Sequence, residues 1–358
     1  MATYYTDWAV GNDGNLGTSE GAGNAWKTID KAMNTVAAGD TVYVKATGPY
    51  LETPTIDTPG TNSSPIVFEG YTSTPGDGGQ ATVDAESTRS YCLADTLSTG
   101  STYYVFKNLI FKRAAVRCVF ISVQDIIFKN CRFTDSADDG CTATGEMMFE
   151  NCLFDNNAGD GVVTSINQSY FFGCRFANNG EHGARLFNSD AYFFDCVFAG
   201  NDGDAIESLT ANGSHIVVVG CTIDGDGKTT NTGIDCSTSY WKRVAVINTI
   251  IYDCTEGIRS YNRGGHFISR NNLLNNNTTD YTNFQTFEGE VTDPPQFADE
   301  AGGDYSLGVS SPALNVGFDG YLQNGSAQLC DIGAIESTSA DGSGGRASRV
   351  LKDGSQMT

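Results

Sequence analysis

A short sequence motif returns about every 22 residues through the middle of the chain, and this period constrains the fold more than any other feature. Its seven copies are FKNLIF (106–111), FKNCRF (128–133), FENCLF (149–154), FFGCRF (171–176), FFDCVF (193–198), VVGCTI (218–223) and VINTII (246–251). A period of this length indicates an array of similar structural units, because each unit can bury its apolar side only against its neighbours.

One position of the motif is restricted to residue types that tolerate a left-handed backbone. In successive copies it is Asn108, Asn130, Asn151, Gly173, Asp195, Gly220 and Asn248. We therefore expect a sharp bend at this position. The next residue is Cys in five copies, and a Phe or Ile stands two residues after that Cys. This alternation of period two indicates strands with one buried side.

A second strand follows a Gly-rich turn in each unit. Its inward column is predicted to be Cys141, Val162, Ala184, Ile206, Ile234 and Ile258. Its outward column, expected to face solvent, is Thr142, Val163, Arg185, Glu207, Asp235 and Arg259. Short strands that align with the same strand of the next unit describe coils stacked about 4.8 Å apart. The sequence therefore predicts an all-β fold, a right-handed parallel β-helix solenoid.

The periodicity also divides the chain. Residues 1–48 are predicted to form an N-terminal cap, with a helix over about 24–37 and a first strand over 38–46. The β-helix is expected over 49–275, a C-terminal closing module over 276–337, and a flexible linker with a basic tail over 338–358.

Composition excludes several classes of protein. The 43 Asp and Glu outnumber the 21 Lys and Arg, and the net charge of -22 excludes a protein that binds nucleic acid through its phosphates. The sequence contains no apolar run long enough for membrane insertion and no secretion signal at its start. The 11 Cys form an odd set without CxxC pairs, so we expect buried, reduced thiols in a protein made in a cytosol.

Motifs at both ends resemble known proteins. The segment NAWKTIDKAMNTVAAGDTVYV (24–44), the Glu at position 52, and the ending DPPQFADEAGGDYSLGVSSPALNVGFDG (293–320) with CDIGAIE (330–336) carry the resemblance. They are similar to right-handed parallel β-helix proteins of the pectate-lyase-like superfamily, over about residues 3–337. Members of this superfamily include polysaccharide lyases, phage and virion surface proteins, and bacterial surface proteins.

A group of charged side chains at the second turn is the strongest catalytic candidate. This charged band consists of Asp139, Asp160, His182, Arg185, Asp204, Glu207, Asp235 and Arg259. The resemblance to lyases implies a Ca²⁺ held by Asp160, Asp204 and Glu207, with Arg185 as the base and His182 beside it. No other cofactor is predicted. The alternative is an outward ladder of ion pairs, with the Asp-Gly pairs acting only as turns.

Three further groups have two interpretations each. The Cys residues that follow the bend form the Cys column, which consists of Cys131, Cys152, Cys174, Cys196 and Cys221. This column is either a metal or redox ladder or, in the favoured interpretation, part of the packed core. The aromatic residues Phe187, Tyr240, Trp241 and Tyr261 either stack on sugar rings or pack between coils. Residues Arg346, Arg349, Val350, Leu351 and Lys352 of the tail are predicted to dock on a partner or on another copy of the chain. His215 and His266 receive no role.

The preferred functional hypothesis is a non-enzymatic virion surface protein, such as a phage head decoration, spike or tail component. It would assemble in the host cytoplasm, contact other virion proteins or copies of itself through the tail, and have host surface polysaccharide as a candidate ligand. The alternatives are a Ca²⁺-dependent polysaccharide lyase or depolymerase, and a secreted or cell-surface bacterial adhesin whose signal peptide was removed.

Overall fold

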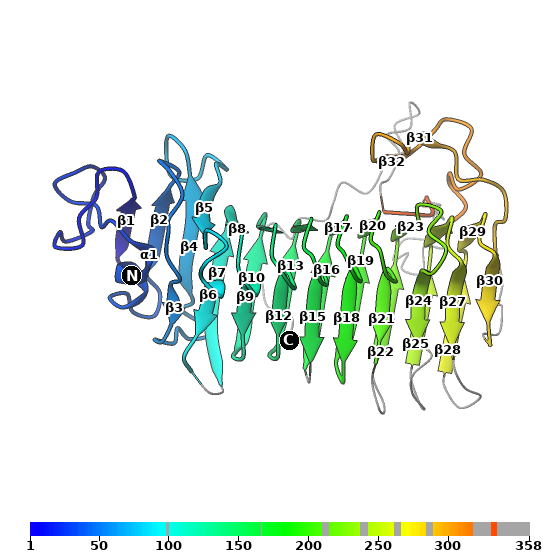
Figure 1. Cartoon of the computed structure of the whole chain (residues 1–358), viewed down its shortest axis with the longest axis horizontal. Helices are drawn as coiled ribbons and strands as arrows, with labels where there is room; N and C mark the ends of the chain where they lie inside the picture. The colour runs from blue at the N-terminus through cyan, green and yellow to red at the C-terminus, as the bar shows by residue number, and fades with distance from the viewer. Residues whose placement is uncertain are drawn as a thin grey trace, which may run out of the picture.

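Each repeat of the sequence forms one coil of a right-handed parallel solenoid, and the coils stack along one axis (Figure 1). The structure is a computed structural model. It describes residues 1–97, 100–165, 167–209, 215–236, 243–260, 266–283, 289–317 and 331–334. Three parallel sheets run along the solenoid, and from β4 (Ile66–Tyr71) onward each coil contributes one strand to each sheet, as expected for a β-helix.

Sheet A has 11 strands, which in order are β1 (Thr3–Asp7), β2 (Thr41–Lys45), β4 (Ile66–Tyr71), β7 (Ser101–Lys107), β10 (Gln124–Lys129), β13 (Met147–Glu150), β16 (Gln168–Phe172), β19 (Asp190–Phe194), β22 (His215–Val219), β25 (Arg243–Ile247) and β28 (His266–Arg270). Sheet B has nine strands, which are β5 (Ala81–Asp84), β8 (Leu109–Lys112), β11 (Arg132–Thr134), β14 (Leu153–Asp155), β17 (Arg175–Ala177), β20 (Val197–Ala199), β23 (Thr222–Asp224), β26 (Ile250–Tyr252) and β29 (Leu273–Asn275). Sheet C has ten strands, which are β3 (Thr55–Ile56), β6 (Tyr91–Asp95), β9 (Arg117–Ile121), β12 (Cys141–Ala143), β15 (Val162–Ser165), β18 (Ala184–Phe187), β21 (Ile206–Ser208), β24 (Thr232–Cys236), β27 (Glu256–Ser260) and β30 (Thr279–Thr282).

The predicted bends lie at the corner between sheets A and B. All seven positions have a positive φ, from 51° at Asn248 to 63° at Gly220. The six-residue motif is therefore the end of one strand, a left-handed corner and the start of the next strand. The prediction from residue type is confirmed, because only such residues adopt this conformation at low cost.

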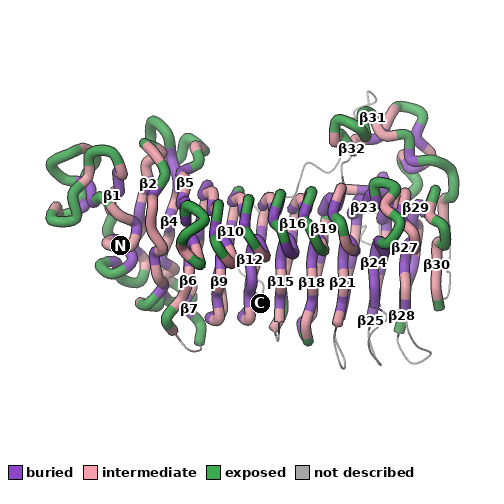
Figure 2. The backbone as a smooth tube through the Cα atoms, viewed as in Figure 1, coloured by how far each residue is buried: buried purple, intermediate pink, exposed green. Residues whose placement is uncertain are grey.

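Aromatic rings fill the core in two columns, one from sheet A and one from sheet B. Phe149 stacks on Phe171 with ring centroids 5.1 Å apart and 3° between the ring planes. In the second column Phe154 stacks on Phe176 at 4.8 Å, also with 3° between the planes. Buried residues lie along the strands of the stacked coils, and many exposed residues lie on the loops (Figure 2). Stacking of this kind contributes about 0.5–1.5 kcal/mol per pair beyond the burial of area.

The Cys column packs into the same core. The ten Cys of the described residues are buried, and none of them forms a disulfide within the described part of the chain. The Sγ of Cys152 donates to the carbonyl of Phe128 at 3.4 Å, and the Sγ of Cys174 donates to the carbonyl of Phe149 at 3.4 Å. These two thiols thus bond to the preceding coil, which supports the packing interpretation.

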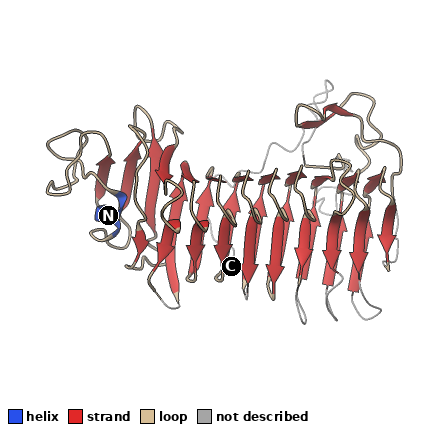
Figure 3. Cartoon of the chain, viewed as in Figure 1, coloured by secondary structure: helices blue, strands red, loops and turns tan. Residues whose placement is uncertain are grey.

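The N-terminal cap differs from its prediction. The helix α1 spans only Ile29–Met33 instead of about 24–37, and it is drawn near the N-terminus in Figure 3. Thr28 caps it by accepting from the N–H of Lys31, and the Glu52 carboxylate accepts from Ile29 and Asp30. Trp26 lies before the helix in a bridge to Thr6. The first strand is also earlier than predicted, because β1 precedes the helix and pairs with β2.

The chain after β30 folds back over the outer side of sheet B. Residues 289–317, which we term the C-terminal clasp, include the antiparallel strands β31 (Phe297–Asp299) and β32 (Asp304–Leu307) (Figure 1). Tyr305 packs on Val197 and Ala199, and its hydroxyl donates to Asp224 at 2.7 Å. The clasp thus buries apolar residues on the outer side of sheet B. Within the described residues, no helix has the length and apolar character needed to cross a membrane.

Candidate functional site

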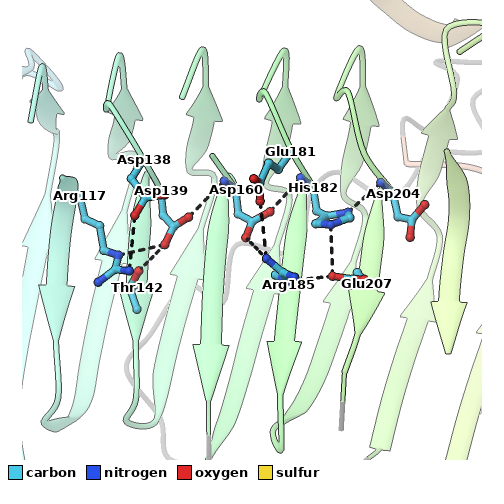
Figure 4. Close-up of polar contacts among 10 residues, drawn as sticks. All are labelled: Arg117, Asp138, Asp139, Thr142, Asp160, Glu181, His182, Arg185, Asp204 and Glu207. Atoms are coloured by element: carbon cyan, nitrogen blue, oxygen red, sulfur yellow. Dashed lines mark hydrogen bonds and ion pairs between the residues drawn. The ribbon is translucent and has the colours of Figure 1, made fainter. Parts of the chain in front are cut away.

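The charged band extends from the turns between sheets B and C onto the strands of sheet C, and Figure 4 draws its part from Asp139 to Glu207. Four of its residues form a ladder in which a side chain accepts the backbone N–H one coil further on. Asp139 accepts from Asp160 at 3.2 Å, Asp160 from His182 at 2.9 Å, His182 Nδ1 from Asp204 at 2.8 Å, and Asp204 from Thr232 at 2.6 Å. One acceptor atom of each of these residues therefore bonds to the backbone of the next coil, a contact that neither interpretation of the band had predicted.

The ladder also fixes the tautomer of the one histidine in the band. Because Nδ1 of His182 accepts a backbone N–H, the neutral ring carries its proton on Nε2. This Nε2 lies 3.2 Å from Oε2 of Glu207. Burial lowers the pKa of His182 from its ordinary value, so the neutral form is favoured.

The outward column of sheet C has the predicted register, with Arg185 opposite Glu207, Glu207 opposite Asp235, and Asp235 opposite Arg259. The prediction that the whole column faces solvent is wrong at Asp235, which is 3% exposed. The guanidinium of Arg259 on the next coil lies 2.6 Å from Asp235 Oδ2 and covers the carboxylate. Thr142 is likewise buried, donating to Asp139 at 2.9 Å.

Arg185 is surrounded by carboxylates from three coils. Its Nε lies 2.9 Å from Glu207, and its Nη1 lies 3.5 Å from Glu181 and 3.7 Å from Asp160. Glu181 was not among the predicted site residues, although a carboxylate four residues before Arg185 indicates an ion pair with it. The Nε of Arg185 and the Oε2 of Glu207 are buried but form no directed hydrogen bond among the described residues. Their close approach is therefore an electrostatic contact with poor alignment, and its geometry leaves both groups able to take a better partner.

Three carboxylates on adjacent coils converge on one point. One oxygen from each of Asp204, Glu207 and Asp235 lies within 4.8 Å of the other two. Because Ca²⁺–O bonds are about 2.3–2.6 Å, two ligands on opposite sides of the ion are about 4.6–5.2 Å apart. The spacing of these three oxygens therefore matches that of ligands sharing one Ca²⁺, which takes six to eight oxygens in all. Asp235 takes the place that the sequence analysis gave to Asp160, which instead faces Arg185.

Burial changes the ionisation of the carboxyl groups in the band. It raises the pKa of Asp160 to about 7 and that of Asp204 to about 7. In contrast, the hydrogen bond from Arg259 to Asp235 raises the pKa of the Arg259 guanidinium, which therefore remains a cation. The band thus combines carboxyl groups that titrate near neutral pH with fixed positive charge.

The aromatic candidates are only partly within the described structure. Phe187 is half-buried beside the band, and the guanidinium carbon of Arg185 lies 5.3 Å from its ring centroid. Tyr240, Trp241 and Tyr261 lie outside the described residues, as do the tail residues Arg346, Arg349, Val350, Leu351 and Lys352. Phe187 is therefore the aromatic candidate that the structure places at the site.

Comparisons with known proteins agree with this architecture. Residues 97–240 match the sequence profile of a family described as the right handed beta helix region. Pectate lyase Pel9A is 18% identical, with 94% of this chain and 96% of that chain covered and a TM-score of 0.70. A glycoside hydrolase is 10% identical, with 86% of this chain and 99% of that chain covered and a TM-score of 0.53. No curated protein sequence matches the chain. The profile match in the central coils and the structural likeness over nearly the whole chain identify the fold as the right-handed parallel β-helix, the architecture of the pectate-lyase-like superfamily.

Proposed function

We propose that the protein is a Ca²⁺-dependent lyase that cleaves a uronate-containing polysaccharide on the outer side of sheet C. The observation that carries this proposal is the convergence of Asp204, Glu207 and Asp235 within 4.8 Å, with Arg185 and Arg259 on either side. Carboxylates alone would repel a polyuronate. A cation between them and two flanking guanidinium groups make the same surface suitable for a carboxylated sugar.

The reaction class is β-elimination. A base removes the proton on the carbon next to the uronate carboxylate, the electron pair forms a carbon–carbon double bond, and the bond to the leaving glycosidic oxygen breaks. A cation bound to the substrate carboxylate supplies charge neutralisation, which makes the proton more acidic. The products are a new chain end that accepts a proton on oxygen and an unsaturated uronate.

The chain supplies positioning and charge. Arg259, held by Asp235, is a fixed cation suited to bind a substrate carboxylate. The face of Phe187 lies beside Arg185 and offers a surface for the apolar side of a sugar ring. Arg185 remains the candidate base, a role that requires its guanidinium to release a proton before it accepts one from the substrate. Glu207 cannot pair fully with both Arg185 and a cation, so Arg185 gains freedom to turn toward the substrate when the cation site is filled.

The test is an assay of the purified protein on polygalacturonate and alginate, with Ca²⁺ and with a chelator, following the ultraviolet absorbance of unsaturated uronate. Glu207→Gln should lower the rate by about 100-fold or more, since it removes a cation ligand. Glu150→Gln is the matched control, because this carboxylate on sheet A pairs with Lys129 at 2.7 Å away from the band. Activity that persists in the chelator, or is equally reduced in both variants, would contradict the proposal.

Hydrolysis is a second candidate, favoured by the pKa of about 7 for both Asp160 and Asp204. A carboxyl that stays protonated near neutral pH is suited to protonate a leaving oxygen. Release of reducing ends without unsaturated product would identify hydrolysis. The virion and adhesin hypotheses draw no support from the fold comparisons and stay predictions from the sequence.

A further inference from the structure

A second polar row lies on sheet A, where its strands begin. Asp190, His215, Arg243 and His266 are in register on four consecutive coils, as the first residues of β19, β22, β25 and β28. Two of the three histidines of the chain belong to this row. The spacings along the chain are unequal, so the sequence periodicity did not reveal the alignment.

The contacts within the row direct hydrogen-bond donors outward. Asp190 accepts from the backbone N–H of His215 at 2.7 Å, and its other oxygen lies 3.1 Å from Nδ1 of the same ring. Nδ1 therefore carries a proton, and Nε2 accepts from Arg243 Nη1 at 3.1 Å. This chain of contacts uses one nitrogen of the Arg243 guanidinium. The other donors of the Arg243 guanidinium and the ring of His266 have no polar partner among the described residues. The side chains of Arg243 and His266 are both exposed.

A shallow pocket adjoins these donors. It has a volume of about 370 Å³ and is lined by His215, Arg243, His266 and the apolar residues Val217, Val244, Ala245 and Ile268. Ile268 is 53% exposed, which is unusual for a large apolar side chain. The pocket thus combines hydrogen-bond donors at one edge, among them the Arg243 guanidinium, with an apolar floor.

We propose that this pocket binds a carboxylated sugar unit, with the carboxylate on Arg243 and His266 and the ring on Val217, Ala245 and Ile268. Charge complementarity favours this occupant, because the donors form an anion-binding edge on a chain of net charge -22. Successive donors are about 4.8 Å apart along the solenoid, close to the length of one pyranose ring. The choice of a uronate rests on the proposed function. The pocket would be a second glycan site on a different sheet from the charged band.

The test measures binding of an oligogalacturonate by calorimetry without Ca²⁺, in the Glu207→Gln background. Arg243→Ala and His266→Ala should each weaken binding by about tenfold, and together they should abolish it. Lys129→Ala is the matched control, as another cation on the outer side of sheet A. His266→Ala removes no polar contact among the described residues, so thermal unfolding should be unchanged and loss of folding cannot explain its effect.

The outcomes separate this inference from the proposed function. Unchanged affinity in both variants overturns the pocket, whether or not the protein is a lyase. Equal binding of inorganic phosphate and oligogalacturonate overturns the assignment to a sugar acid, since the site would then recognise any anion. Loss of binding in Arg243→Ala in a protein without lyase activity supports the pocket and contradicts only the proposed function.

Discussion

At the scale of single residues, the corner between sheets A and B depends on backbone conformation more than on side-chain chemistry. Asn130 has a φ of 52°, and its amide donates to Asn108 at 3.3 Å. The equivalent corner residue is Gly173 or Gly220 in later coils, with φ values of 59° and 63°. The residue type is therefore set by tolerance of the left-handed conformation, with the amide contact as a smaller addition.

Asn130→Ala should lower the free energy of unfolding by about 1–2 kcal/mol, because a Cβ without a local polar contact is unfavourable at this φ. Asn130→Gly also loses the amide contact, but glycine adopts the left-handed conformation without steric cost. Its free energy of unfolding should therefore stay close to that of the parent protein. Thermal unfolding followed by circular dichroism compares the two. Equal losses in both variants would show that the amide contact, and not the backbone, determines the corner.

The buried carboxyl of Asp160 gives stability a pH dependence. Its pKa is about 7 in the folded protein, above its ordinary value of 3.8, because burial disfavours the charge. Its contribution is therefore fully present below about pH 4 and is lost as the pH rises to about 7. Asp160→Asn keeps the acceptor for the N–H of His182 and removes the titration.

We expect Asp160→Asn to match the parent protein at pH 4 and to exceed its unfolding free energy at pH 8 by on the order of 2 kcal/mol. Unfolding midpoints at pH 4, 6 and 8 measure this difference. A variant that is less stable at pH 8 would show that the contact of Asp160 with Arg185, 3.7 Å long, outweighs the burial of charge.

At the scale of elements, alternate residues of each strand point inward, where they pack in the core, and outward. On β16, Phe171 points into the core and stacks on Phe149 and Phe193 with centroid distances of 5.1 and 4.7 Å. Its neighbour Phe172 is half-buried and stacks on Phe194 at 5.2 Å on the outer side. The two residues have the same side chain and strand but different burial.

Phe171→Ala should lower the unfolding free energy by about 3–5 kcal/mol, since it removes a fully buried ring between two others. Phe172→Ala, its matched control, should cost about 1 kcal/mol, as expected for the loss of one partly exposed stacked pair. Urea titration of both variants provides the comparison. Similar losses would mean that the outer side of sheet A is covered in solution.

Strands and corners could be predicted because period and residue type both encode them. The start of the helix could not be predicted, because Trp26 matches the helical spacing but lies before the helix. Its ring stacks on that of Tyr4, with the ring centroids 4.7 Å apart. Register predicted that Glu207 and Asp235 lie together. It did not predict that Asp235 is buried, because that depends on how Arg259 folds over it. The polar row on sheet A, which contains His215, was not predicted because its members are unequally spaced along the sequence.

At the scale of the whole molecule, the carboxylate cluster joins two adjacent coils, since Asp204 and Glu207 precede Asp235 by one coil. An ion bound between them would stabilise the stack of coils. Because the three carboxylates meet only in the folded chain, the free energy of Ca²⁺ binding at this proposed site would add to stability.

Millimolar Ca²⁺ should therefore raise the unfolding midpoint of the parent protein by a few degrees, while Asp235→Asn should reduce this increase by more than half. Differential scanning calorimetry with Ca²⁺, Mg²⁺ and a chelator measures the effect. An equal increase in the parent and the variant would place any bound cation elsewhere.

The C-terminal clasp changes how the molecule comes apart. Most contacts in a solenoid join neighbouring coils, so such proteins fray one repeat at a time from an open end. Here Arg175 donates to the carbonyl of Gly303 at 3.0 Å, across 128 positions of sequence. The final coils cannot peel away while this connection holds, because the clasp fastens them to a coil near the middle. Loss of the last turns then becomes a single cooperative event, because residues 289–317 hold the final coils against the coils that precede them.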